Sequence, residues 1–260
     1  MNHETHNTIG YDLTDAEVQF YNDQGYLYMP GFVRREAAGA LRAEVLEIMR
    51  EVFGLDADRL GRAEDAKDAL RQSNQYLAGS RLDELINGER TKAVAGRLIG
   101  GNAHVYLPFT AVKAGGGGGK FHLHQDNQYT NHYPAEGSLN IWVALVDMSP
   151  ENGCLQISPH SQKDGPLLKK AELGKGDFIT PESEAHRLFQ LRMCAGDAVA
   201  FTRLTVHGSG PNNTSDPRVA YALQYHREDV EYDHPETGGK QRLVDSPRFK
   251  VGPVEKLTPQ

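Results

Sequence analysis

The residue pattern of this chain changes near Gly100, and that change limits the folds that the chain can adopt. Before this glycine, apolar residues recur at helical spacing, as at Leu41, Val45 and Ile48. After it, short runs of β-branched and aromatic residues alternate with Gly, Pro and Asn. Helices followed by strands predict an α+β chain that is mainly β, with many short strands closing into a barrel or sandwich.

The first hundred residues contain signals for individual elements. Thr14 and Glu17 form a capping box, which predicts a helix that stops near Gly25. The stretch 26–29, just before a proline, predicts a short strand. Helical spacing predicts further helices, and their expected ranges are about 41–52, 66–78 and 81–98.

The rest of the chain divides into strands and polar stretches. The expected strands cover 104–113, 121–125, 138–147, 154–157, 186–193, 197–208 and 218–226. The polar stretches 158–185 and 227–260 are expected to form loops, a tail or a lid. A chain of 260 residues fits a single domain. We expect its parts to be a mainly helical part at 1–100, a barrel core at 101–226 and a C-terminal tail or lid at 227–260.

Composition and charge exclude several classes of protein. A net charge of −7 argues against a sequence-independent nucleic-acid binder, which needs a basic face. No run approaches the ~18 apolar residues of a spanning helix, and the polar N-terminus does not resemble a secretory signal. Cys154 and Cys194 show no CxxC spacing, which suits a reducing compartment. We therefore expect a cytoplasmic protein with neither nucleic-acid nor membrane partners.

The densest cluster of polar side chains lies at 121–129, with the sequence FHLHQDNQY. Residues i and i+2 of a strand share a face, so His124 and Asp126 can reach one point together. His207, 81 residues after Asp126, ends an apolar run at a turn and offers a third ligand. Two imidazoles and one carboxylate leave three positions open, which suits iron(II) with a chelating cosubstrate and oxygen. A hydrolytic zinc site needs only one open position.

Arg218 opens an extended run in which period two places Gln224 on the same face as the arginine. The two residues between them on that face are alanines, so the face has room for a ligand. A guanidinium binds a carboxylate in bidentate fashion, which the far carboxylate of 2-oxoglutarate requires when its keto-acid end chelates iron. Taken alone, an arginine at a strand start also fits a surface salt bridge.

This set of residues resembles the phytanoyl-CoA dioxygenase family of iron- and 2-oxoglutarate-dependent oxygenases over most of the chain. The matching segments, in chain order, are Leu13-Thr14 through Tyr21, Gly25-Tyr26 to Pro30-Gly31-Phe32, His124-Gln125-Asp126 with Tyr129, Trp142-Val143-Ala144-Leu145, Glu151-Asn152-Gly153-Cys154-Leu155, Gly196-Asp197, His207-Gly208-Ser209-Gly210-Pro211-Asn212 and Arg218. The segment Ser158-Pro159-His160-Ser161 departs from the family's Pro-Gly-Ser-His. This departure concerns the shape of a loop and none of the proposed ligands.

The resemblance implies a fold and a set of roles. The fold would be a double-stranded β-helix, a jelly-roll or cupin-like barrel, with the N-terminal helices packed outside. The iron(II) ligands would be His124, Asp126 and His207. Arg218 would clamp the 2-oxoglutarate carboxylate, and Ser209 and Trp142 would help to enclose it. Candidate contacts to substrate or cosubstrate are Lys113, Asn127, Tyr129 and Gln224.

The reaction implied by this resemblance consumes 2-oxoglutarate and O2, hydroxylates or otherwise oxidises a small molecule, and gives succinate and CO2. An intact carboxylate at Asp126 favours hydroxylation over halogenation, because a halogenase has a small residue there. The acidic chain offers no strong site for nucleotide phosphates, so an amino acid derivative or a natural-product intermediate is favoured over an acyl-CoA.

Two alternatives fit part of the pattern. Gly116, His122 and His124 match the glycine and HxH part of a cupin signature, which would mean a metalloenzyme independent of 2-oxoglutarate. The glutamate that should follow in that signature is missing. The second alternative is a non-catalytic metabolite-binding module on the same fold, against which the intact ligand set and Arg218 argue.

Overall fold

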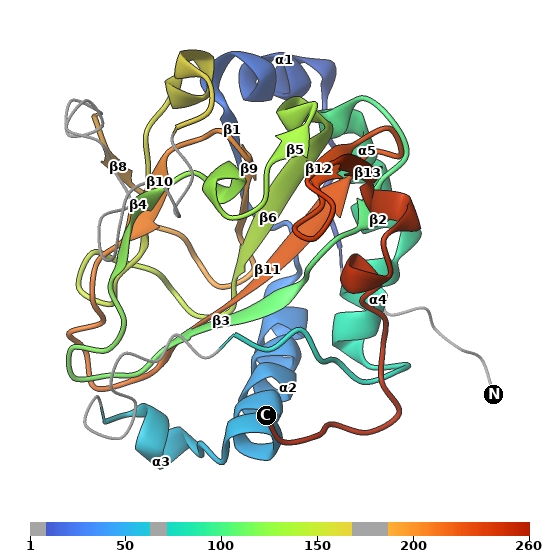
Figure 1. Cartoon of the computed structure of the whole chain (residues 1–260). Helices are drawn as coiled ribbons and strands as arrows, with labels where there is room; N and C mark the ends of the chain where they lie inside the picture. The colour runs from blue at the N-terminus through green and yellow to red at the C-terminus, as the bar shows by residue number, and fades with distance from the viewer. Residues whose placement is uncertain (1–8, 63–71, 168–186) are drawn as a thin grey trace.

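The structure is a computed structural model that describes residues 9–62, 72–167 and 187–260 (Figure 1). The described residues before Gly100 form helices α1 (Asp15–Gln24), α2 (Arg35–Phe53), α3 (Ala57–Leu60), α4 (Arg81–Asn87) and α5 (Glu89–Ile99). The predicted capping box starts α1: Thr14 Oγ1 accepts from the Glu17 amide, and the Glu17 carboxylate accepts from the Thr14 amide. The helix ends at Gly25, whose φ of 80° is accessible to glycine without strain.

Two helix predictions need correction. The helix expected over 81–98 is divided into α4 and α5, because Gly88 has extended dihedrals (φ −60°, ψ 139°). The helix expected over 66–78 is wrong for 72–78, which contains no helix, while 66–71 lie outside the described residues. Ser73 instead exchanges hydrogen bonds with Thr110, so this stretch runs beside a strand.

The main sheet is antiparallel, with the order β1–β9–β6–β11–β2 and with β3 also paired to β11. Its strands are β1 (Tyr26–Met29), β2 (His104–Val105), β3 (Phe109–Lys113), β6 (Ser138–Ala144), β9 (Ala198–Thr202) and β11 (Arg218–His226). The run expected over 104–113 is interrupted at 106–108, where Pro108 cannot donate to a ladder. The fully buried β6 and β11 form its centre.

A second antiparallel sheet has the order β4–β10–β7–β8. Its strands are β4 (Phe121–His124), β7 (Leu155–Ile157), β8 (Phe189–Gln190) and β10 (His207–Ser209). The single run expected over 197–208 is therefore two strands in different sheets. A turn in which the Thr205 amide donates to the Thr202 carbonyl separates β9 from β10 and brings His207 into the second sheet.

The two faces of the main sheet pack against different partners. Ile141, Val143 and Leu223 point into a large apolar cluster shared with the helices. Trp142 and Ala220 point the other way and pack with Leu155 and Ile157 of the second sheet in a smaller cluster. The strand alternation thus separates a helix-packed core from an interior between the two sheets, where the candidate site lies.

The C-terminal stretch 227–260, expected to be a loop, tail or lid, contains ordered elements. Strands β12 (Glu231–Asp233) and β13 (Lys240–Arg242) form a three-stranded sheet with β5 (His132–Tyr133). Phe249 and Leu243 pack against Tyr106 in a third apolar cluster. The segment after β11 is therefore packed onto the body at these points.

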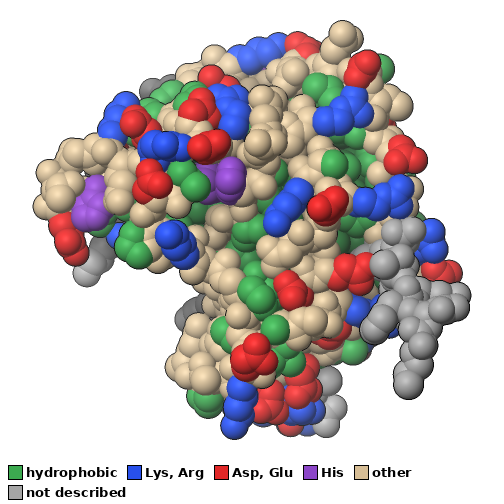
Figure 2. Space-filling model, turned by 90° about the vertical axis from the view of Figure 1, so that its right-hand side faces the viewer, with side chains coloured by type: hydrophobic (Ala, Val, Ile, Leu, Met, Phe, Trp, Pro, Cys, Tyr) green, Lys and Arg blue, Asp and Glu red, His purple; other side chains and the backbone are tan. Residues whose placement is uncertain are grey.

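The surface agrees with the mixed composition of the chain. On the face drawn in Figure 2, acidic and basic side chains are interspersed, and the basic ones do not gather into one patch. Across the described ranges, none of the helices has the length and apolarity that crossing a bilayer requires.

Candidate active site

The pairing of β4 with β10 brings the three predicted metal ligands together. His124 lies directly opposite His207 in this ladder, with a distance of 4.3 Å between ring centroids. Asp126 follows β4 at the start of a short 3-10 turn, Asp126–Gln128, and its Oδ1 lies 3.7 Å from His124 Nε2 and 3.6 Å from His207 Nε2. One ligand atom from each residue falls within 4.8 Å of the others, which is close enough for a single ion.

Backbone carbonyls orient both imidazoles. His124 Nδ1 lies 2.8 Å from the carbonyl oxygen of His122, and His207 Nδ1 lies 2.9 Å from that of Thr205. A hydrogen on each Nδ1 leaves the Nε2 lone pair free to face Asp126. Burial, and next the neighbouring His124, lower the pKa of His207 to about 4, so its neutral form prevails at neutral pH. Neutral imidazole is the form that binds metals.

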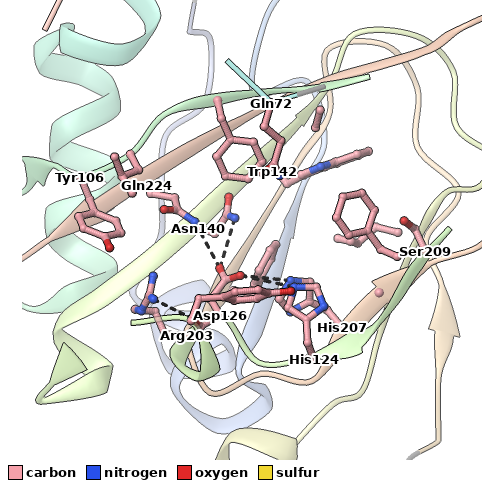
Figure 3. A pocket seen from close by; sticks show the side chains of 18 of the residues that line it. Gln72, Tyr106, His124, Asp126, Asn140, Trp142, Arg203, His207, Ser209 and Gln224 are labelled. Carbon is pink, nitrogen blue, oxygen red and sulfur yellow. Dashed lines mark hydrogen bonds and ion pairs between the residues drawn. The ribbon is translucent and has the colours of Figure 1, made fainter. Parts of the chain in front are cut away.

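Asp126 is held as a carboxylate. Burial raises its pKa, but the adjacent His124 and His207 rings and the charge of Arg203 outweigh that effect, so the pKa lies well below its usual range. The amide nitrogens of Asn140 and Gln224 each lie 3.5 Å from Oδ2 (Figure 3). The carboxylate therefore presents Oδ1 to the imidazoles and Oδ2 to two amides.

The ligand group forms part of the wall of a cavity of about 330 Å³. Arg218, Trp142 and Ser209, which were expected to contact the cosubstrate, also line this cavity. Figure 3 shows Ser209 on one side of the histidines, with Tyr106, Gln224 and Arg203 on the other side of Asp126. The cavity therefore extends to both sides of the ligand group.

Arg218 is a buried cation without a carboxylate partner. Its side chain is only 2% exposed, and its guanidinium carbon lies 5.1 Å from the Trp142 ring centroid. Nη1 donates to the Ala111 carbonyl at 3.3 Å, while Nε is buried without a hydrogen-bond partner. Burial lowers the pKa of Arg218 to about 9, and no carboxylate among the described residues pairs with it. A buried, uncompensated guanidinium is costly unless an anion occupies the cavity beside it.

Lys113 lies behind Ser209 rather than in the cavity wall. It is fully buried and directly opposite Arg218 in the β3–β11 ladder. Its Nζ donates to Ser209 Oγ at 2.6 Å and also to the carbonyl of Gly210. Burial, and then the charge of Arg218, lower the pKa of Lys113 to about 6. Lys113 therefore holds the Ser209 hydroxyl from outside the cavity wall.

The remaining candidate contacts divide into two groups. Gln224 and the half-exposed Tyr129 line the cavity, with the Tyr129 ring 5.4 Å from that of His124. Asn127 does not line it: its Oδ1 accepts from the His132 amide at 2.9 Å and from Arg203 Nε at 3.4 Å. Asn127 thus shapes the turn after Asp126, and its expected contact with substrate or cosubstrate is not supported.

Sequence reasoning missed Asn140, Arg203 and Tyr106, all of which line the cavity. Asn140 stands two residues before Trp142 in a strand, so a polar residue in an otherwise apolar run was a usable signal. Arg203 and Tyr106 gave no such signal, because each reaches the site only through long-range packing. His122, by contrast, is exposed and does not belong to the ligand group.

Comparisons with known proteins agree with the resemblance expected from the motifs. The family model for phytanoyl-CoA dioxygenase (PhyH) matches residues 21–220. Phytanoyl-CoA dioxygenase domain-containing protein 1 of Danio rerio is 27% identical over 259 residues, covering 81% of this chain and 89% of that protein. Methylphosphonate hydroxylase of Gimesia maris is 29% identical over 222 residues, covering 82% and 80%.

The fold is also found among solved structures. The crystal structure of EctD from S. alaskensis with 2-oxoglutarate and 5-hydroxyectoine matches with a TM-score of 0.70 at 20% identity, covering 95% of this chain and 92% of that one. With a family model that matches most of the sequence, this chain belongs to the phytanoyl-CoA dioxygenase family.

Proposed function

We propose that the chain is an iron(II)- and 2-oxoglutarate-dependent dioxygenase that hydroxylates or otherwise oxidises a small molecule and releases succinate and CO2. The observation that carries this proposal is the shared cavity. It contains a His-Asp-His group with both Nε2 atoms available, and a buried arginine that lacks a carboxylate partner. Family membership supports the same activity.

The donor set fits iron(II). His124, Asp126 and His207 supply two nitrogens and one oxygen, and this triad leaves open positions for exchangeable ligands. Iron bound there would supply the activation of O2 and the oxidative decarboxylation of 2-oxoglutarate. The protein's part is to hold the imidazoles neutral and oriented through the carbonyls of His122 and Thr205.

Arg218 would bind the far carboxylate of 2-oxoglutarate, with Ser209 beside it and the Trp142 ring covering the guanidinium. Their shared cavity and the unpartnered Nε of Arg218 support this assignment. Lys113 would act through Ser209, because its Nζ bonds that hydroxyl and does not line the cavity. Substrate would occupy the part of the cavity near Tyr129 and Gln224.

The two antiparallel sheets are proposed to form the double-stranded β-helix of this family. Their inner faces share one apolar cluster, in which Trp142 and Ala222 of the main sheet meet Leu155 and Ile157 of the second. The similarity in fold to EctD supports this architecture. The site would then lie between the two sheets.

A small-molecule substrate is supported by relatives that match the chain, such as methylphosphonate hydroxylase and L-proline trans-4-hydroxylase. The cupin alternative is disfavoured because His122, which would be one of its ligands, is exposed and does not belong to the group of converging ligand atoms. Stoichiometric production of succinate would reject the alternative of a non-catalytic binding module.

The test is an anaerobic titration of the iron(II)-loaded protein with 2-oxoglutarate, monitored by the weak visible charge-transfer band of the chelate. The band should appear in wild type, vanish in His124→Ala and require much more cosubstrate in Arg218→Ala. His122→Ala, an exposed histidine on the same strand that lies outside the ligand group, should behave as wild type. Metal binding without a band at any cosubstrate concentration would refute the proposal.

A further inference from the structure

A second buried arginine, Arg203, lies in the same cavity on the other side of Asp126 from Ser209 (Figure 3). It follows β9 and is only 3% exposed. Its Nη2 donates to the backbone carbonyls of Asp126 at 2.8 Å and Thr130 at 3.0 Å. These bonds explain part of its role, because they fix the turn that carries Asp126.

Those bonds do not use the whole guanidinium. Nε is directed to Asn127 Oδ1 at 3.4 Å, and Nη2 uses its two hydrogens on carbonyls. The two hydrogens of Nη1 form no hydrogen bond with a described residue. One nitrogen of a residue in the cavity wall therefore retains its full capacity to donate.

Arg203 forms no ion pair with a carboxylate among the described residues, although its charge helps to lower the pKa of Asp126. It binds Asp126 through the backbone oxygen, while the Asp126 carboxylate is directed to His124 and His207. The guanidinium carbon lies 5.5 Å from the Tyr106 ring centroid, which provides a cation–π contact but no negative charge.

The other neighbours do not supply an anion either. Burial, and next the charge of Arg203, lower the pKa of His132, and burial lowers that of His226 to about 4. Both imidazoles are therefore neutral near pH 7. A metal ion at the ligand group would also offset the charge of Asp126. The surroundings of Arg203 thus favour an incoming anion.

We propose that Arg203 binds a carboxylate of the substrate, so that the enzyme acts on a short organic acid or amino acid. This inference rests on the proposed function, because it assigns Arg218 to 2-oxoglutarate and Arg203 to the second reactant. Arg203 contacts the backbone of a proposed metal ligand, so carbons a few bonds from the bound carboxylate would lie near the metal. A cavity of about 330 Å³ that must also hold 2-oxoglutarate favours a short substrate.

The test uses the zinc-loaded protein, in which no turnover occurs, with 2-oxoglutarate saturating so that Arg218 is occupied. Ligand-observed saturation-transfer NMR would compare short unbranched amino and hydroxy acids with their neutral primary amides and with the corresponding phosphonic acids. We expect at least one carboxylic acid to bind and its amide to bind at least about 10-fold more weakly. Equal binding of acid and amide, tighter binding of the phosphonic acid, or no binding of any acid would overturn the proposal.

Three variants separate recognition from structure. Arg203→Gln should weaken acid binding about 10- to 100-fold and abolish the preference for acid over amide. Arg203→Lys should retain part of that preference, because the charge remains. Arg248→Gln removes an exposed cation that lies over Phe249 outside the cavity wall, and it should change nothing.

Different experiments would refute the role of Arg203 and the proposed oxygenase activity. A missing charge-transfer band in the wild-type iron protein would reject the oxygenase. The comparison of acid with amide uses zinc and still decides the role of Arg203. Arg203→Gln could also lose the metal, because the turn at Asp126 would loosen. In that case the preference of the wild-type protein for the acid over its amide decides whether the site binds a substrate carboxylate.

Discussion

Asn140 and Gln224 lie directly opposite each other on β6 and β11, and the amide nitrogen of each is 3.5 Å from Oδ2 of Asp126. Both amides can therefore orient the carboxylate from the side away from the imidazoles. Asn140→Leu and Gln224→Met should each lower affinity for iron(II) or zinc roughly 10- to 100-fold, because second-shell partners fix ligand geometry. Metal titration measures this effect. Gln72→Met, an amide elsewhere on the cavity wall, is the control, and unchanged affinity in the first two variants would contradict the prediction.

Gly208, in β10, lets the two strands that carry the histidines approach each other closely. A Cβ on Gly208 would lie 3.0 Å from the carbonyl oxygen of Phe121 and 3.1 Å from that of His122, whereas one on Gly210 would meet nothing within 4 Å. Gly208→Ala should push β10 away from β4, destabilise the protein by about 1–3 kcal/mol and weaken metal binding. Gly210→Ala should leave both unchanged. Chemical denaturation and metal titration would show whether the two variants differ.

Removing the buried charge of Arg218 should abolish stabilisation by 2-oxoglutarate without lowering the stability of the free protein. Without 2-oxoglutarate, Arg218→Met should be at least as stable as wild type, because an uncompensated buried cation is lost. With metal and 2-oxoglutarate, wild type should gain in Tm and the variant should not. The exposed Arg192→Met is a matched charge control that should keep the gain. A variant that is both less stable without cosubstrate and still stabilised by it would refute the assignment.

Binding of 2-oxoglutarate should take up a proton at neutral pH. The pKa of Lys113 is lowered to about 6 by burial and by Arg218, so this lysine is mostly uncharged near pH 7.5. A carboxylate beside Arg218 and Ser209 would favour the charged form and raise that pKa. The bound state therefore carries more protons than the free state, and the uptake should fade below about pH 6, where Lys113 is already protonated.

Calorimetry of 2-oxoglutarate binding, in buffers with different ionisation enthalpies, measures that uptake. The apparent heat should depend on the buffer in wild type and lose this dependence in Lys113→Met. The exposed Lys120→Met is the matched control and should keep it. A buffer-independent heat in wild type at pH 7.5 would show that Lys113 does not change its protonation.

Local signals predicted the parts of the fold that local physics determines. The capping box at Thr14 and the glycine at 25 fixed the limits of the first helix, and the run 218–226 coincides with β11. The failures have equally physical causes. Gly88 interrupts a helical pattern, and the turn at Thr202–Thr205 moves the chain from one sheet to the other within an apparently continuous strand.

The proposed ligands were accessible from sequence because His124 and Asp126 are close in the chain and His207 stands in a motif. Arg203 was not, because it acts on Asp126 through contacts between distant segments. Strands of two or three residues, such as β5 and β12, are too short to show a period. Their pairing, and with it the packing of the C-terminal stretch, had no sequence signal.

The ladder that places His207 opposite His124 is built from backbone hydrogen bonds, so the two imidazoles face each other although they are far apart in the chain. An ion bound across these strands would act as a staple that closes a loop of more than eighty residues. Changes in the exposed segments that join the strands within that loop can then be accommodated without moving the ligands. Substrate preference can therefore diverge in such a chain while its redox chemistry is retained.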